Sequence, residues 1–255
     1  GGLVPFALYS GRSVLTRFSL PPGTSRPGWL PAGEVRAPLI RVAMDGAFRR
    51  VVAWDTSLVR PTCAIPVSAA GGQWTTTIPF CPEAASDVSS NGSFIVMATP
   101  ATETSFRLVL LRAEGDTVYS RVHVFSPKRI PPAVADSALQ RLKNLTGLAR
   151  GAPPEFRAQA NTAVRNALRT KKVPTTYPPF VRVSLGDDGT CWLEEFPAGQ
   201  GHRWIGFGPD GRKLGVIELG ARSRLKVVKG DQLWVVEADV DDIQSVVRYR
   251  VVAGQ

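Results

Sequence analysis

The chain has 255 residues, of which 44% are hydrophobic and 20% are charged, a composition typical of a globular protein rather than a disordered one. Its 24 Gly and 21 Pro residues are too many for a helical bundle and fit a chain with many turns. The net charge of +10 raises nucleic acid, anionic lipid and acidic proteins as partner classes, and the presence of only two His residues leaves little room for His-based metal sites or catalytic triads.

The first half of the chain has the pattern of short strands joined by tight turns. Residues 106–111, for example, are rich in aliphatic side chains and read as a strand. The pairs Asp45-Gly46, Asn91-Gly92 and Glu114-Gly115 favour hairpins, because both central residues of such turns must tolerate positive φ. We therefore expect antiparallel β-structure over residues 1–127.

Three cysteines are present, and none forms a Cys-x-x-Cys pair, which excludes a zinc ribbon or a thioredoxin-type motif. Cys63 and Cys81 are 18 residues apart and flank a turn followed by a strand. They are either a disulfide, in an oxidising compartment, or two unrelated small buried residues. Cys191 lies between Thr190 and Trp192, far in sequence from either His, and we expect a small core residue rather than a nucleophile.

Residues 128–172 break the β pattern. After Pro131-Pro132, apolar residues recur at the spacing of one helix face, and a second such segment follows Pro153-Pro154. The core-facing residues predicted for the two helices are Val134, Ala138, Leu142, Leu145, Phe156, Ala160, Ala163, Val164, Ala167 and Leu168. The sequence thus predicts a two-helix insertion between regions of β-structure.

This insertion carries most of the charge of the protein. It has two acidic residues and ten basic ones, a net +8 of the total +10: Lys128, Arg129, Arg141, Lys143, Arg150, Arg157, Arg165, Arg169, Lys171 and Lys172. Such a surface could dock on an acidic protein or on anionic lipid headgroups, or it could be only a solvated face. Nucleic acid is disfavoured, since Phe156 is the only aromatic residue on the two helices and sits at a core-type position.

Residues 173–255 return to the strand pattern, for example at 225–228 and 246–252, with turns at Asp188-Gly189, Asp210-Gly211 and Lys229-Gly230. A repeat emerges when the glycines are aligned. Residues 39–46, 108–115 and 204–211 match one another, and a second turn type precedes each of them. Two hairpins give four strands per unit, and a unit of about 40–50 residues has the size of a propeller blade.

The segments Gly189-Thr-Cys-Trp-Leu-Glu-Glu, Arg203-Trp-Ile-Gly-Phe-Gly-Pro-Asp-Gly and Val246-Val-Arg-Tyr-Arg-Val-Val resemble the C-terminal part of exported bacterial six-bladed β-propellers of the NHL-like type. The resemblance covers most of residues 74–127 and 173–252, and more weakly residues 3–54, and implies an all-β fold of four-stranded antiparallel blades. Six blades need about 300 residues. We therefore expect an incomplete propeller, either because blades lie outside this chain or because the ring is open or completed by a partner.

The acidic and histidine residues predict no catalytic or metal site. Asp187-Asp188 and the run Asp239-Val240-Asp241-Asp242 fall where turns are expected and match no EF-hand spacing. Glu194 and Glu195 are adjacent on a strand and point to opposite faces, so they cannot share an acid/base site. We expect structural roles for His123 and His202, and we expect no cofactor.

The sequence as a whole favours a non-enzymatic interaction module. We expect an extrinsic subunit, periplasmic or extracellular, that docks through its basic insertion on a larger membrane-embedded complex, such as a photosynthetic or respiratory assembly. It has no apolar run of about 18 residues and thus no predicted membrane-spanning segment of its own. Two alternatives stay open: a propeller hydrolase or lyase with its site in a central channel, and a ligand-binding sensor domain. The domains expected are blades at 1–127, the basic insertion at 128–172 and blades at 173–255.

Overall fold

The computed structural model of the protein describes residues 3–9, 13–18, 28–31, 37–43, 45, 47–55, 63–69, 72–144, 154–196 and 201–252. The described structure is mostly β, with two helices. The chain divides into two units. The first unit is formed by residues 1–59, 83–125 and 179–255, and the second by residues 60–82 and 126–178.

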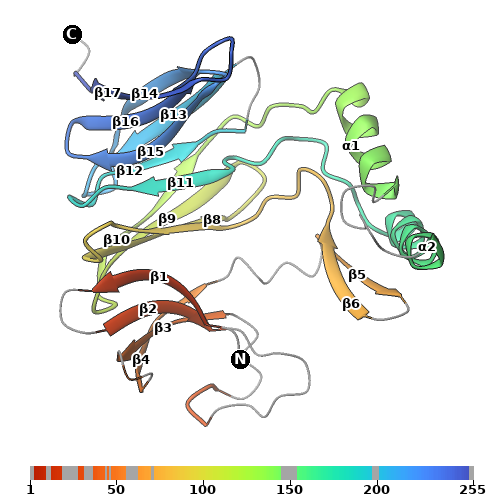
Figure 1. Cartoon of the computed structure of the whole chain (residues 1–255), viewed down its shortest axis with the longest axis horizontal. Helices are drawn as coiled ribbons and strands as arrows, with labels where there is room; N and C mark the ends of the chain where they lie inside the picture. The colour runs from red at the N-terminus through yellow and green to blue at the C-terminus, as the bar shows by residue number, and fades with distance from the viewer. Residues whose placement is uncertain are drawn as a thin grey trace. The chain divides into compact units, whose positions relative to one another are not determined.

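The first unit is built of antiparallel sheets whose strands are hydrogen-bonded in sequence order (Figure 1). Three of these sheets have four strands each, as the sequence predicted, and the last has three. Their strands are β1 (Leu3–Tyr9), β2 (Ser13–Phe18), β3 (Ala37–Ala43) and β4 (Phe48–Asp55); β7 (Ala85–Val88), β8 (Phe94–Pro100), β9 (Ser105–Arg112) and β10 (Thr117–Val124); β11 (Arg182–Leu185), β12 (Cys191–Glu194), β13 (Gly201–Phe207) and β14 (Lys213–Gly220); and β15 (Ser223–Lys229), β16 (Gln232–Ala238) and β17 (Gln244–Arg250).

Glycine turns connect the strands of these sheets where the sequence placed them. Gly115 joins β9 to β10 with φ of 94°, and Gly211 joins β13 to β14 with φ of 76°. A positive φ favours glycine at both positions, and close packing is a second reason. An added Cβ on Gly115 would lie 2.8 Å from the Val52 carbonyl oxygen, and one on Gly211 would lie 2.8 Å from the Tyr119 ring. The turn predicted at Asp45-Gly46 includes Gly46, which lies outside the described residues.

The core of this unit lies between successive sheets. On β12, Cys191 and Leu193 belong to a cluster shared with β8 and β9, whereas Trp192 belongs to a cluster shared with β15 and β16. Every residue of β12 is therefore buried, on both faces of the strand. The sheet β7–β10 is covered in the same way, since Ile95 of β8 packs with residues of β3 and β4 while Val96 packs on the other side with residues of β11 and β12.

The second unit combines a hairpin, β5 (Ala64–Ala69) and β6 (Gly72–Thr77), with two helices, α1 (Pro132–Asn144) and α2 (Pro154–Thr170). Both helices begin at a proline, as predicted, where the missing N–H costs no hydrogen bond. Their small core is formed by Ile65 and Ile78 against Ala160 and Val164 of α2, with the partly buried Leu142 beside them.

The observed unit is larger than the predicted insertion of residues 128–172. It includes residues 60–82, which the sequence analysis assigned to the blades. The apolar contacts of Ile65 and Ile78 with α2 explain this difference. One helix residue also departs from expectation: Val134 of α1 is 38% exposed instead of facing the core, and Leu145 lies outside the described residues.

The packing of Trp192 over Gly206 gives a direct test of the sheet core. The two residues are register partners on β12 and β13, and a Cβ on Gly206 would come within 2.9–3.0 Å of three atoms of the Trp192 ring. Because that ring is 2% exposed and cannot move outward, we expect Gly206→Ala to lower the free energy of unfolding by about 1–3 kcal/mol, measured by urea denaturation.

The matched control is Gly215→Ala. Gly215 is the register partner of Gly206 on β14, and a Cβ there would meet no atom within 4 Å. This variant should stay within about 0.5 kcal/mol of the wild type. Equal stability of the two variants would contradict the observed position of Trp192.

Candidate functional site

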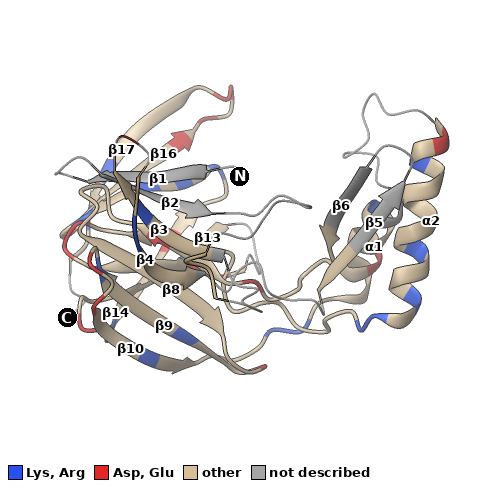
Figure 2. Ribbon diagram, turned by 90° about the horizontal axis from the view of Figure 1, so that it is seen from below, with Lys and Arg blue, Asp and Glu red and all other residues tan. Residues whose placement is uncertain are grey.

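The strongest candidate for a functional surface is the set of cations on the helical unit, coloured blue along α2 in Figure 2. The side chains of eight of the ten predicted residues are described; those of Lys143 and Arg150 lie outside the described residues. Seven of the eight are exposed: Lys128, Arg129, Arg141, Arg157, Arg165, Arg169 and Lys172. None of these seven forms an ion pair with any acidic group in the described part of the chain.

The helix itself places three of these cations together. Arg157, Arg165 and Arg169 fall within an arc of about 120° at 3.6 residues per turn, beside the face buried by Ala160 and Val164. Lys171 follows the helix, is half-buried and has a partner. The burial of the apolar face of α2 within its own unit therefore fixes which cations point to solvent.

The ends of the insertion are held together by backbone hydrogen bonds. The N–H of Tyr177 donates to the carbonyl of Lys128 over 2.9 Å, and the N–H of Ile130 donates to the carbonyl of Thr175 over 3.0 Å. These bonds hold the exposed Lys128 and Arg129 beside residues 175–177, in the segment just before α1.

A disulfide between Cys63 and Cys81 closes the hairpin of this unit, with the two Cα atoms 5.8 Å apart. Of the two interpretations left open by the sequence, the structure has the bridge. Beside it, the N–H of Ile78 donates to the carbonyl of Cys63 over 2.9 Å. A loop of this length is stabilised by a disulfide by about 3 kcal/mol, which is substantial for so small a core.

The remaining cysteine, Cys191, lies in the core of the first unit and is 0% exposed. Its sulfur lies 3.8 Å from the Tyr119 hydroxyl oxygen. Burial raises the pKa of the Cys191 thiol to about 12, with the hydrogen bond from Tyr119 opposing the shift. The thiol is thus kept protonated at neutral pH, as expected of a core residue and not of a nucleophile.

Glu194 and Glu195 serve separate partners, as their opposite faces predicted. The Glu194 side chain is 4% exposed, and its Oε1 lies 2.5 Å from Nδ1 of His202. Its Oε2 lies 3.3 Å from Nε of Arg182, but the angle between the two groups is not that of a hydrogen bond. The Nε2 of His202 faces the carbonyl oxygen of Ala221 at 3.3 Å. Both ring nitrogens of His202 therefore lie close to oxygen atoms, which hold the imidazole ring in place. Glu195 pairs with Arg203.

His123 has a structural role of another kind. Its ring packs against Phe106 and Phe207, with centroid distances of 5.4 and 4.6 Å, and its buried Nε2 has no hydrogen-bond partner in the described structure. Burial lowers the pKa of His123, and the nearby Arg121 acts in the same direction. The histidine therefore acts as an aromatic core residue.

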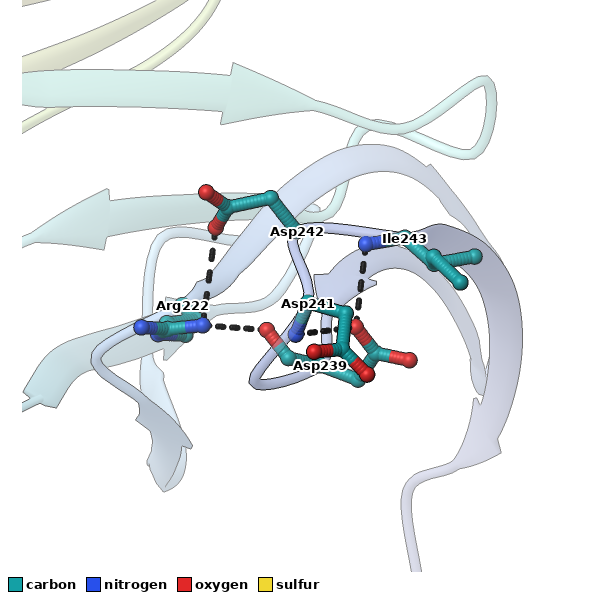
Figure 3. Close-up of polar contacts among 5 residues, drawn as sticks. All are labelled: Arg222, Asp239, Asp241, Asp242 and Ile243. Carbon is teal, nitrogen blue, oxygen red and sulfur yellow. Dashed lines mark hydrogen bonds and ion pairs between the residues drawn. The ribbon is translucent and has the colours of Figure 1, made fainter.

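The acidic runs lie in turns, as predicted. Figure 3 shows the turn between β16 and β17, where Asp239 Oδ1 accepts the N–H groups of Asp241 and Ile243, each over 2.9 Å. Arg222 donates to the Asp239 carbonyl and lies 3.5 Å from Asp242. Asp188 likewise accepts hydrogen bonds from Thr190. Within the described ranges, no group of three or more His, Cys, Asp or Glu residues could hold a metal ion.

Two aspartates of the first unit connect the sheet β7–β10 to the sheet β11–β14. Asp187, in the turn after β11, accepts hydrogen bonds from the Ser90 hydroxyl and the Asn91 N–H. Asp87 on β7 accepts the N–H of Leu185 over 2.9 Å and that of Val88 over 2.8 Å. Sequence analysis missed Asp87, because a single acid in a strand carries no local signal of a contact with a residue 98 positions away.

A polar hollow of about 250 Å³ lies on the first unit, lined in part by Arg41, Arg112 and Glu114. Arg41 is already paired there, with its Nη1 3.6 Å from Glu114 Oε1. No helix in the described part of the chain is long and apolar enough to cross a membrane.

Thiol titration tests the cysteine assignments. At pH 8, we expect a thiol reagent to find no reactive group in the folded, oxidised protein, because Cys191 is buried and the other two cysteines are bonded. Unfolding in guanidinium without a reductant should release one thiol per chain, and reduction should raise the number to three.

The control is Cys191→Ala, which should show no thiol after unfolding without a reductant. Three thiols in the unfolded, unreduced wild type would show that the disulfide is absent, and a fast reaction of the folded protein would show that Cys191 is accessible.

The environment of Asp87 makes a prediction about pH. Burial raises the pKa of Asp87 above its ordinary value of 3.8, against the smaller opposing effect of the N–H groups of Leu185 and Val88. The folded chain therefore holds this proton to higher pH than the unfolded chain, so the contribution of Asp87 to stability falls as pH rises from 3.8 through its folded-state pKa. Asp87→Asn should remove this fall, measured by urea denaturation between pH 3 and 7.

The useful quantity is the difference in the free energy of unfolding between wild type and variant at each pH, since the other carboxylates cancel. A constant difference across the range would contradict the prediction. Glu103→Gln is the control, because Glu103 is exposed in a turn of the same sheet.

No protein-family model matches the chain, and no curated protein matches it. Among solved structures, an uncharacterized protein of Listeria monocytogenes EGD-e, lmo1340, is similar over 96% of this chain and 82% of its own, with 8% identity and a TM-score of 0.26. A chain from a structural and mechanistic analysis of two prolyl endopeptidases is similar over 98% of this chain, with 13% identity and a TM-score of 0.28, and this protein covers 40% of its length. At such TM-scores, neither likeness carries an argument about fold or function.

Proposed function

We propose that this protein is a non-enzymatic interaction module that docks on an acidic protein surface of a larger, membrane-embedded assembly. The docking surface is the cationic helical unit. The observation that carries the proposal is the group of exposed cations without ion-pair partners in the described structure, centred on Arg157, Arg165 and Arg169 of α2.

The distribution of charge supports docking over mere solubility. Residues 128–172 carry a net +8, so the rest of the chain is nearly neutral at +2. Cations that serve solubility alone gain nothing from being gathered on one small unit, where they repel one another. Gathered cations instead steer association with an acidic partner and set its orientation.

An acidic protein fits this surface better than anionic lipid headgroups do. Helices that lie on membranes present large apolar side chains to the acyl region beside their cations. On α2 the large apolar side chains are buried or half-buried, and the exposed positions beside the cations carry small or polar residues, such as Ala158, Thr162 and Asn166. The test must therefore distinguish binding to an acidic protein from binding to anionic lipid headgroups.

The disulfide supports a periplasmic or extracellular location. Disulfides such as Cys63–Cys81 form and persist in oxidising compartments and are rare in the cytosol. We propose on this basis that the protein is exported.

For the scaffold, we propose a partial β-propeller of the NHL-like type. Antiparallel sheets of four strands in sequence order, with β7–β10 and β11–β14 each packed between two neighbouring sheets, are the arrangement of propeller blades. In this proposal the second unit is an insertion carried by that scaffold, built from the segments before and after the sheet β7–β10.

Charge neutralisation on α2 tests the function. We expect Arg165→Gln with Arg169→Gln to reduce the amount of partner that co-purifies with the protein from its natural source by about tenfold, because each lost cation weakens attraction to an acidic surface. The measurement is quantitative mass spectrometry of the co-purified proteins and lipids. Gln keeps a good helix propensity, so α2 should stay folded.

The matched control is Arg49→Gln with Arg50→Gln, which removes two exposed cations from β4 and should leave the partner in place. Unchanged co-purification in the α2 variant would refute the proposal. Loss of bound anionic lipid with no loss of a protein would assign the surface to a membrane instead.

A further inference from the structure

The last sheet of the first unit, β15–β17, is covered on one face only. In the sheet β11–β14, the second strand is buried on both faces. In β15–β17 the corresponding strand, β16, buries Leu233 and Val235 in the core shared with Trp192, while Trp234 and Val236 on its other face are only half-buried. In the described structure, the packing that covers β7–β10 and β11–β14 on both sides therefore stops at this face.

The register of the three strands defines the residues of this open face. Val227, Trp234 and Arg248 form one cross-strand row, and Arg224, Val236 and Val246 form the next. A third row consists of Lys229, Gln232 and Arg250. The apolar members are accessible, since Val227 is 45% exposed and Val246 is 71% exposed. The open face thus has an apolar centre.

Cations surround this centre. They are Arg224, Lys226, Lys229, Arg248 and Arg250, all exposed, with Lys226 in the bulge between Leu225 and Val227. Arg250 pairs with Asp231, whereas the other four have no ion-pair partner in the described structure. Among the described residues, no acidic side chain occupies a position on the open face itself: Asp231, Asp239, Asp241 and Asp242 lie in turns, and Glu237 lies on the opposite face of β16, where it accepts hydrogen bonds from Ser223 and Tyr249.

We propose that the open face of β15–β17 is a second docking surface, which takes an acidic face of a partner protein with apolar side chains at its centre. An uncovered sheet face of aromatic and aliphatic residues gains free energy when another surface excludes water from it. Its cations select the sign of the partner's charge. A second copy of this chain does not fit, since the same cations would then face each other across an isologous contact.

This inference goes beyond the proposed function, because the open face belongs to the first unit and the docking helices belong to the second. The two surfaces can therefore be tested independently, with charge variants on each.

The experiment uses two acidic polypeptides as probes, polyglutamate and a random copolymer of glutamate and tyrosine. Val246→Cys, labelled with an environment-sensitive dye, reports on the open face, and the buried Cys191 does not compete for the label. We expect the copolymer to bind more tightly than polyglutamate, with a blue shift of the dye, because its rings can pack against Val227 and Trp234. Arg224→Glu with Arg248→Glu in the labelled protein should weaken both by at least about tenfold.

Arg165→Glu with Arg169→Glu in the same labelled protein is the matched control, and it should leave the dye response at residue 246 unchanged. Circular dichroism of each variant verifies that the sheets remain folded. If the variant with Arg224→Glu and Arg248→Glu gave the same dye response as the labelled protein that keeps both arginines, the proposal would be refuted.

Three further outcomes would also overturn it. Self-association of the unlabelled protein through this face, seen in analytical ultracentrifugation and abolished by the Arg224/Arg248 change, would identify a second copy as the occupant. A dye shift with phosphatidylserine vesicles and none with either polypeptide would identify a membrane. Equal affinity for the two polypeptides would show that the apolar centre plays no part.

Discussion

The structure of the first unit depends on the need of each β-sheet to cover its apolar faces. A sheet that is apolar on both sides must lie between two others, and β12 shows this most clearly, with Leu193 facing one neighbouring core and Trp192 the other. The short glycine turns follow from the same constraint. At Gly115 and Gly211 the neighbouring sheet approaches so closely that any side chain would collide with it.

The second unit meets the same need in another way. Its segments, residues 60–82 and 126–178, are separated in the sequence by the whole of the sheet β7–β10, and both contribute to one apolar cluster. The side chains of Ile65 and Ile78 complete the core of α2, and the Cys63–Cys81 bridge reduces the entropy lost when the hairpin is ordered. With the large apolar side chains of α2 so occupied, its exposed surface consists mainly of cations and polar groups.

Local signals predicted most of the secondary structure, because each needs only a few neighbouring residues. Proline at the helix starts and glycine in the hairpins act through their own backbone preferences, and the strands 106–111 and 225–228 lie within β9 and β15. Contacts between distant residues leave no such local signal. Residues 60–82 have a strand pattern whether they pack on a blade or on a helix, and nothing beside His123 in the sequence shows that its ring lies between Phe106 and Phe207. Equivalent blade positions predict packing between sheets for Trp192, Trp204 and Trp234 alike; Trp192 and Trp204 are buried, but Trp234 is only half-buried.

The difference between Trp192 and Trp234 explains why the two cationic surfaces have different characters. Trp192 lies on a strand that is covered on both faces, and the buried carboxylate of that strand, Glu194, has His202 and Arg182 beside it. Trp234 lies beside Arg248 on a face where cations occupy positions that apolar residues hold in the covered sheets. Such cations oppose stacking of identical sheets, since desolvating several like charges against each other costs more than the central valines would gain. The open face thus combines apolar side chains with cations that disfavour self-association, whereas α2 exposes cations, polar groups and the small Ala158, with its large apolar side chains buried or half-buried.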